Sequence, residues 1–436
     1  MACRIPSHLS RLGLLAVVVI LPLTAWSQFP PECTDLKESS RPEMEQQRAA
    51  LTNEVIRAMS SLPNATAIPD AIKSKQARLL ELVFKLDCIR PDARADPLFD
   101  TRAADTARNV LVPVFFATNR AANMAQPKRL MFNSEIVKEI TWGKAVVSVP
   151  TDRSPGDLNV PALWKFELKP DISKHFVLTE VKSLGSSGGF AEAIKQDLSQ
   201  ASSKSLLLFV HGYRVTFDEA AMRTAQLAHD LRFRGISMFY SWPSRGDLLG
   251  YWHDEEAVQL SEAGYDFLLE TLDTLPFQSI YVLAHSMGNR LVTTVHNERT
   301  KAGKDLKAVK EVLLAAPDIS AELFNDKIAP LFAMAGQPRT TIYASDGDVA
   351  LIASKVVHQF RRLGDASPPV YRRSPFETID ASNAAPMRRA AGHSYVFDSP
   401  KVITDVQRLL IQGQPADIRP TLQRVQGETP RYWTFK

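Results

Sequence analysis

From residue 110 onward the chain alternates between short apolar runs and longer amphipathic stretches, a pattern typical of strands and helices in turn. The apolar runs predict strands at 111–118, 145–149, 162–168, 176–181, 205–210, 237–241, 279–284, 308–315, 340–344 and 377–379. Helices are expected at 218–233, 254–272, 289–297, 348–357 and 399–410. Strands that alternate with helices predict an α/β fold, with a mostly parallel sheet covered by helices on both faces.

The first residues have the pattern of a secretory signal. Arg4 and Arg11 precede an apolar run at 12–25, and Ala25-Trp26-Ser27 provides small residues around a cleavage point. The apolar run is shorter than the roughly 20 residues that a membrane-spanning helix needs. We therefore expect residues 1–27 to be a signal peptide and the mature protein to be exported, to the periplasm or beyond the cell.

Residues 28–90 are expected to form a helical hairpin, because 44–60 and 71–86 have helical periodicity and Pro63-Asn64 separates them. Cys33 and Cys88 flank the outer ends of this hairpin, and an oxidising compartment favours a disulfide between them. The alternative is two free thiols in a cytosolic chain.

Three further segments complete the expected organisation. Residues 91–109 are polar and contain proline, so they are interpreted as a linker. Residues 110–411 form the predicted catalytic domain. Residues 412–436 are a polar tail, which the aromatic pair Tyr432-Trp433 would dock.

Composition narrows the possible partners. The 436 residues are 45% hydrophobic and 23% charged, with a formal charge of +4, and no basic run is interleaved with aromatics. A nucleic-acid partner is therefore not expected. The sequence contains no His-Glu-x-x-His, no Cys/His cluster with zinc spacing and no glycine-rich phosphate loop, so no metal or cofactor is expected.

The strongest chemical motif follows the apolar strand at 279–284. Ala284-His285-Ser286-Met287-Gly288 has small residues on either side of a serine and leads directly into a predicted helix. A strand, a sharp turn and a helix in this order would lift the Ser286 hydroxyl above the sheet, where it can act as a nucleophile. The N-terminus of the following helix would face the same point and favour a developing negative charge.

A second motif supplies the remaining donors of an oxyanion hole. The strand at 205–210 runs into His211-Gly212-Tyr213, where Gly212 would let the backbone pass close to a substrate. The backbone N–H groups of Tyr213 and Met287 are the predicted oxyanion donors. His211 itself is expected to be structural.

Ser286 needs a base, and the order of elements selects His393, which lies in a loop after the last predicted strand and before the final helix. His296 and His358 are expected to serve packing or the surface, and the side chain of His285 is expected to leave the turn in a different direction from Ser286.

Asp348 is the predicted acid, because it follows the second strand after the one that carries Ser286. Asp318, at the end of the intervening strand, is the main alternative. Asp380 could reach the same loop, although capping of its own turn explains it.

Together these motifs resemble a bacterial branch of the alpha/beta-hydrolase superfamily that is esterase- or lipase-like and has no assigned substrate. The resemblance spans about residues 110–410. Its motifs are Phe115 to Arg120, His211 to Tyr213, Arg223 to Gln226, Tyr240 to Gly246, Ala284 to Arg290, Ala316 to Asp318, Tyr343 to Ser345 and Thr378 to Ser382. The resemblance implies hydrolysis of a carboxylic ester or related acyl compound, with a small-molecule or lipid acyl substrate.

Some residues of these motifs have no evident chemistry. Arg245 could line the substrate entrance or pair with a nearby carboxylate, and Asn119-Arg120 has the same ambiguity. His253-Asp254-Glu255-Glu256 is interpreted as an acidic turn that caps a helix. A non-catalytic binding or scaffolding protein of the cell envelope, built on the same fold, remains the alternative function.

Overall fold

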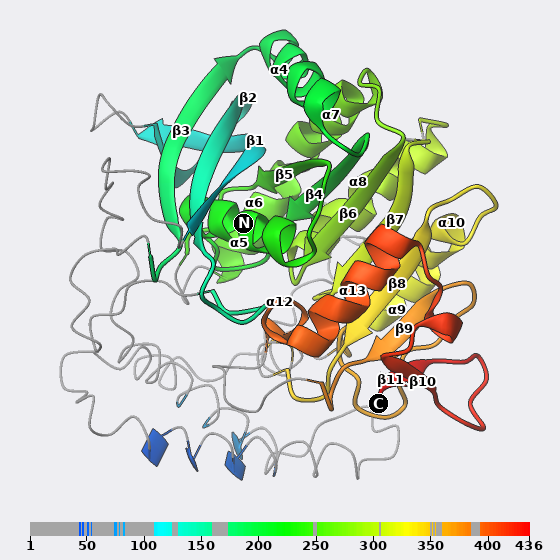
Figure 1. Ribbon diagram of the computed structural model, residues 1–436. Coiled ribbons are helices and arrows are strands. Elements are labelled where there is room, and N and C mark those ends of the chain that lie inside the picture. The colour runs from blue at the N-terminus through cyan, green and yellow to red at the C-terminus, as the bar shows by residue number, and fades with distance from the viewer. Residues whose placement is uncertain are drawn as a thin grey trace, which may run out of the picture.

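A single sheet of eleven strands organises the part of the chain that the structure, a computed structural model, describes (Figure 1). The described residues are 109–123, 130–158, 173–246, 251–304, 307–348, 351, 354, 360–384 and 393–436, with isolated positions between 43 and 82. The strands lie in the order β10-β11-β9-β8-β7-β6-β4-β5-β1-β2-β3.

The centre of the sheet is parallel. Its strands are β4 (Ser205–Val210), β5 (Ile236–Ser241), β6 (Ser279–His285), β7 (Val309–Ala315), β8 (Arg339–Ala344) and β9 (Glu377–Asp380). Both faces of these strands are covered, so near-continuous apolar sequences such as that of β4 are buried along their whole length. Because side chains alternate across a strand, Leu206 and Leu208 enter one hydrophobic core and Leu207 and Phe209 the other.

Each edge of the sheet carries antiparallel strands. On one side β1 (Asn109–Asn123) runs parallel to β5, and β2 (Met131–Pro150) and β3 (Val177–Gly185) follow in antiparallel pairings. On the other side β11 (Trp433–Phe435) pairs with β9, and β10 (Leu422–Arg424) pairs with β11. The tail is therefore part of the sheet, and Trp433 anchors it as a buried strand residue.

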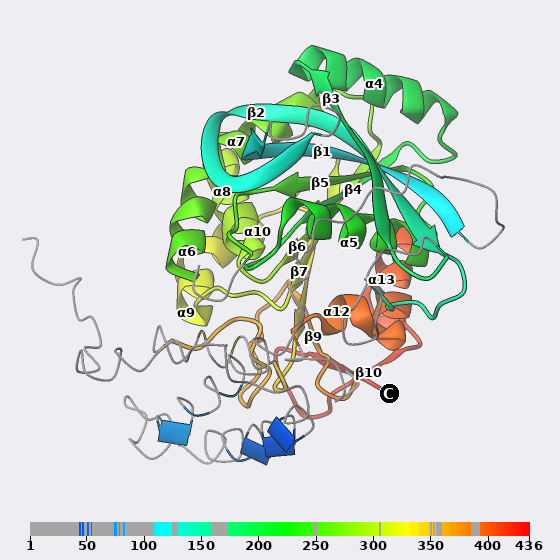
Figure 2. The same cartoon turned by 90° about the vertical axis from the view of Figure 1, so that its left-hand side faces the viewer.

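Helices cover both faces, as Figure 2 shows by viewing the sheet from its side. One face carries α4 (Ser187–Gln200), α6 (Tyr251–Leu260), α7 (Glu262–Asp273), α8 (Gly288–Lys301) and the segment of α9 (Ala321–Leu323), a π-helical turn (Phe324–Ile328) and α10 (Ala329–Phe332). The other face carries α5 (Phe217–Asp230), α12 (Tyr395–Asp398) and α13 (Pro400–Gln412). A short 3-10 turn, Ala416–Ile418, follows. The predicted fold class is confirmed.

Three details differ from the sequence-based prediction. The helix expected at 254–272 is two helices, because Ser261 donates its hydroxyl to the Ala257 carbonyl and is itself held by Asn119 Nδ2 at 2.9 Å. Helix α4 was not expected, since Gly188 and Gly189 in its first turn weaken the helical signal, but the Ser186 side chain caps it. Finally, β9 is not the last strand, because β10 and β11 come after His393 in sequence.

Several predictions lie outside the described residues. These are the signal peptide 1–27, the Cys33–Cys88 disulfide, most of the hairpin and linker, the strand at 162–168, and the helix at 348–357 apart from 348, 351 and 354. At the isolated N-terminal positions the backbone is helical, and Lys75 Nζ lies 2.9 Å from Glu54 Oε2. Within the described residues, no helix has both the length and the apolar character that crossing a membrane requires.

Candidate active site

Ser286 occupies a strained turn between β6 and α8. Its φ angle is 51°, in the left-handed region that residues with a Cβ rarely adopt. The turn is fixed from both sides, because Ser286 N donates to the Ala315 carbonyl at 3.0 Å and the Asn289 side chain donates to the Ser286 carbonyl at 2.9 Å. A Cβ on Gly288 would lie only 2.3 Å from the His211 carbonyl oxygen, which explains the requirement for glycine here. The predicted elbow is therefore present as a fixed, strained turn.

Asp348 and His393 form a direct pair. His393 Nδ1 lies 2.9 Å and 2.8 Å from the two carboxylate oxygens of Asp348. Asp348 is fully buried behind β8, and Leu351 N also donates to it at 3.1 Å. Burial lowers the pKa of His393, but the adjacent Asp348 charge and hydrogen bond outweigh this effect and leave the pKa above its usual value. Burial in turn raises the pKa of the Asp348 carboxyl, against the opposing effect of His393.

His285 connects the two parts of the site. Its Nε2 lies 3.1 Å from the His393 carbonyl oxygen, and the two imidazole rings are 4.6 Å apart. Burial lowers the pKa of His285, so its ring is neutral and Nε2 carries the proton that it donates to that carbonyl. The loop that carries His393 is thus attached to the residue directly before Ser286. Among the described residues, Ser286 Oγ itself has no direct hydrogen bond to His393.

The backbone of Gly212 lies against both Ser286 and His285. A Cβ built on Gly212 would be 2.7 Å from Ser286 Cβ and 3.0 Å from His285 Nδ1, so only glycine fits. Tyr213 comes next along this turn, and Met287 is buried at the start of α8. Tyr213 and Met287, whose N–H groups were predicted to bind an oxyanion, are therefore the residues directly after Gly212 and Ser286, which contact each other.

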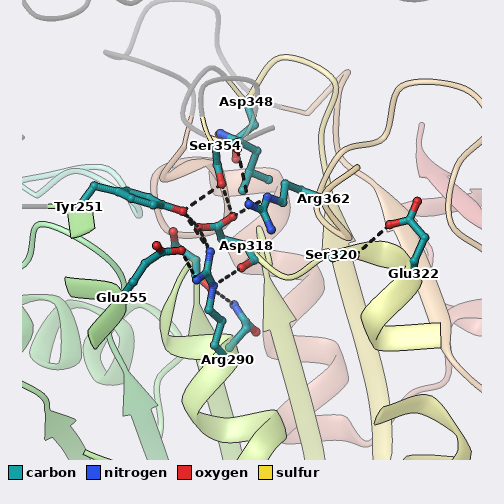
Figure 3. A network of polar contacts seen from close by, with 12 residues as sticks. Tyr251, Glu255, Arg290, Asp318, Ser320, Glu322, Asp348, Ser354 and Arg362 are labelled. Carbon is teal, nitrogen blue, oxygen red and sulfur yellow. Dashed lines mark hydrogen bonds and ion pairs between the residues drawn. The ribbon is translucent and has the colours of Figure 1, made fainter. Parts of the chain in front are cut away.

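Asp318, the alternative acid, is held by two arginine side chains and two hydroxyls (Figure 3). Its carboxylate lies 3.1 Å from both Arg290 Nη2 and Arg362 Nε, and it accepts hydrogen bonds from the hydroxyls of Tyr251 at 2.8 Å and Ser354 at 2.6 Å. Although burial opposes it, these two guanidinium groups lower the pKa of Asp318 to about 2. Its contact with the elbow is through the backbone, from Asp318 N to the Ser286 carbonyl at 3.2 Å.

The side chains of the remaining candidates make other contacts. Asp380 accepts a hydrogen bond from Ser382 N at 2.9 Å, as expected for a residue that caps its own turn. Arg245 is exposed, and its backbone N–H donates to Asp254 at 2.8 Å. His296 lies beside the Tyr265 hydroxyl, and His358 is outside the described residues. His211 is buried and stacks on Trp242, with ring centroids 4.9 Å apart.

Two buried charged residues near the site had no role in the sequence-based prediction. Arg120 was left ambiguous, and Asp254 was interpreted as part of a helix cap. Asp254 does lie in the first turn of α6, but its carboxylate is also fully buried and accepts hydrogen bonds from two loops. The sequence offered one signal for Arg120 and Asp254: both lie in motifs to which no chemical role had been assigned. Across the described residues no group of three or more histidine, cysteine or acidic side chains is placed to hold a metal ion.

Comparison with known families gives one match. Residues 186–412, more than half of the chain, match a family described as "Alpha/beta hydrolase of unknown function (DUF900)". This segment contains Ser286, Asp348 and His393. The search of curated proteins finds no match.

Among solved structures, similar chains include a fungal esterase from Rhizomucor miehei, with 11% identity, a TM-score of 0.31, and coverage of 83% of this chain and 96% of that one. An esterase from the archaeon Pyrobaculum calidifontis has 10% identity, a TM-score of 0.28, and coverage of 83% and 96%. An arylesterase has 11% identity, a TM-score of 0.28, and coverage of 49% and 76%.

Proposed function

Since this chain belongs to the alpha/beta-hydrolase family DUF900, we propose that it is a serine hydrolase that cleaves a carboxylic ester or related acyl compound. In this proposal Ser286 is the nucleophile, His393 the general base and Asp348 the acid that orients the base. The N–H groups of Tyr213 and Met287 hold the oxyanion.

The observation that carries the proposal is the His393–Asp348 pair beside a strained serine turn. An imidazole whose Nδ1 is held at 2.8 Å by a buried carboxylate has a fixed orientation and leaves Nε2 available for a proton. The His285 hydrogen bond brings the backbone of this same histidine to the elbow at 3.1 Å. A serine–imidazole hydrogen bond is often loose without substrate and tightens when substrate binds.

The reaction proceeds by acyl transfer. His393 Nε2 takes the proton from Ser286 Oγ as Oγ bonds to the substrate carbonyl carbon, and the carbonyl π electrons move onto oxygen. The carbon–oxygen bond to the leaving alcohol then breaks, and His393 returns the proton to that oxygen. Water attacks the resulting acyl-enzyme with the same base, which releases the carboxylic acid and regenerates Ser286.

Electrostatics agree with these roles. The Asp348 carboxylate stabilises the imidazolium that forms when His393 accepts the proton, which is the reason for the raised pKa of His393. The strained turn and the helix behind it aim backbone dipoles at the point where negative charge develops.

We further propose that the enzyme acts after export, because of the signal-like segment at 1–27. Its substrate would be a small-molecule or lipid acyl compound. The acyl group would then belong to a compound of the cell envelope or its surroundings.

A panel of p-nitrophenyl esters of increasing chain length tests the proposal. The wild type should hydrolyse at least one ester, and Ser286→Ala should lose roughly 10³-fold or more in kcat. Ser205→Ala is the matched control and should keep wild-type activity, because Ser205 begins β4 and the turn with the predicted oxyanion donor Tyr213 follows the other end of that strand. If the folded wild type and Ser286→Ala are equally inactive on every ester, the hydrolase proposal fails and a binding or scaffolding role becomes the better explanation.

A further inference from the structure

The turn that carries the proposed oxyanion donor is held in an unfavourable conformation. We call residues 211–216 the oxyanion turn. They join β4 to α5 without regular secondary structure, and Arg214 within them has a φ angle of 59°. A residue with a Cβ adopts this angle only when its surroundings force it to. The contacts that hold the turn therefore decide where the Tyr213 N–H points.

Arg120 provides the first of these contacts from β1. Its guanidinium, which is fully buried, donates to the Val215 carbonyl at 2.7 Å and to the Ser244 carbonyl at 2.9 Å. It also donates to Ser241 Oγ at 2.8 Å and lies 3.5 Å from His211 Nε2. Burial lowers the pKa of Arg120 to about 10, so the group stays charged at neutral pH. Arg120 thus attaches the oxyanion turn to the loop after β5.

Asp254 provides the matching contacts from α6. Its carboxylate accepts from Arg214 N at 3.2 Å, from Ser244 Oγ at 2.5 Å and from Arg245 N at 2.8 Å. Ser244 Oγ in turn accepts from Val215 N at 3.1 Å. The backbone groups on both sides of the strained Arg214 are therefore fixed, directly or through one hydroxyl, by a single carboxylate.

Neither charge is explained by an ion pair with a partner of fixed charge. Within the described residues no carboxylate lies within 4.0 Å of Arg120, and the acid that affects its pKa most is the more distant Asp254. The basic side chain beside Asp254 is the imidazole of His253, whose Nδ1 lies 3.3 Å from the carboxylate. Burying a charge is costly unless hydrogen bonds satisfy it. Here those hydrogen bonds go to the backbone and hydroxyls of two loops, so the two charges serve to fix loop geometry.

We propose that Arg120 and Asp254 are positioning residues that clamp the oxyanion turn and thereby hold the Tyr213 N–H where the oxyanion forms. The inference rests on the proposed hydrolase function. It assigns a role to Arg120, Ser244 and Asp254, one residue from each of the Asn119-Arg120, Ser241-to-Gly246 and His253-to-Glu256 motifs. An oxyanion hole works only if its donors are placed before the reaction, so a turn that relaxes should lower kcat more than it changes KM.

Asp254→Asn tests the clamp. Its amide NH2 would face one of the donors Arg214 N, Ser244 Oγ and Arg245 N, so at least one contact is lost. We expect kcat on the best ester of the panel to fall by roughly 10²-fold with KM changed by less than about threefold. Ser244→Ala is the milder second variant, with an expected loss of about tenfold. The control is Asp405→Asn, which removes an equally buried carboxylate whose partners are Tyr343, Arg419 and Thr421 rather than residues of the turn.

Two readouts separate positioning from a general loss of structure. Sulfur is a weak hydrogen-bond acceptor, so a thionoester gains little from an oxyanion hole. The ratio of ester to thionoester rates should therefore fall by about tenfold in Asp254→Asn and stay constant in Asp405→Asn. In addition, amide hydrogen exchange in a peptide containing residues 211–216 should be faster in Asp254→Asn than in the wild type.

An unchanged rate ratio together with unchanged exchange in folded Asp254→Asn and Ser244→Ala overturns the clamp. A wild type that cleaves no ester overturns the proposed function instead. In that case amide exchange still reports whether Asp254 orders the turn, so the two failures can be told apart.

Discussion

Replacing Asp318 with asparagine should destabilise the protein while leaving its chemistry largely intact. Asp318 is the residue that most closely competes with Asp348 for the role of triad acid. It is 2% exposed, its two ion-pair partners are Arg290 and Arg362, and it makes no ion pair with His393, whose pKa it raises only through its charge. Substitution of Asp318 should therefore lower stability more than activity, and substitution of Asp348 should lower activity.

The magnitude follows from the pKa of Asp318, which falls from 3.8 to about 2 in the fold. Each pKa unit corresponds to about 1.4 kcal/mol, so the ionised carboxylate stabilises the fold by roughly 2 to 3 kcal/mol. Because the folded-state pKa is below the unfolded value, this stabilisation is complete above about pH 4 and disappears as the pH falls through 2. The substitution also leaves Arg362, which is 4% exposed, without its carboxylate, so a total loss of about 3 kcal/mol is expected at pH 7.

Urea unfolding at pH 7 and at pH 3 measures this loss. The difference between Asp318→Asn and wild type should be about 3 kcal/mol at pH 7 and clearly smaller at pH 3. Ester hydrolysis by the folded variant should stay within about tenfold of wild type, whereas Asp348→Asn should lose roughly 10³-fold to 10⁴-fold. If Asp318→Asn is as inactive as Asp348→Asn and equally stable as wild type, the assignment of the acid is wrong.

Two further predictions concern the same site. The kcat/KM value should fall as the pH drops through an apparent pKa above the ordinary 6.5 of histidine, because His393 must be neutral to accept a proton. In the pH–rate profile of Asp348→Asn this apparent pKa should be lower than in the wild type. A wild-type value below 6.5 would contradict the pairing of His393 with Asp348. Gly212→Ala should lower kcat/KM by roughly 10²-fold and destabilise the fold by about 1–3 kcal/mol, since its Cβ would lie 2.7 Å from Ser286 Cβ. The control Gly188→Ala should leave kcat/KM unchanged, because its Cβ would have no neighbour closer than 3.6 Å. Equal activities in the two variants would refute the close approach of Gly212 to Ser286.

Local sequence patterns were sufficient for the central sheet. The apolar run at 205–210 gives the bounds of β4 without error, because a strand buried on both faces is apolar along its length. The order of elements also singled out Asp348 over Asp318, and the structure pairs Asp348 with His393. This worked because the parallel strands β6, β7 and β8 follow one another in the sheet as they do in the sequence.

Other features depended on contacts between distant residues and had no local signal. The break at Ser261 is stabilised by Asn119, which is 142 positions away. The polar tail joins the sheet because the buried Arg419 pairs with Asp405 and Glu377, and a buried arginine in a polar stretch is indistinguishable from an exposed one by sequence alone. The contacts of Arg120 and Asp254 with the oxyanion turn could not be predicted either, because the sequence does not show that these two side chains are buried.

Covalent labelling at Ser286 is the most direct test of the account. We expect a fluorophosphonate to modify the folded wild type at a single serine, and peptide mass spectrometry to locate the adduct at Ser286. Ser286→Ala should stay unlabelled, and the wild type should lose its reactivity on unfolding. Labelling of Ser286→Ala at the wild-type rate, or an adduct on another serine of the wild type, would contradict the central claim.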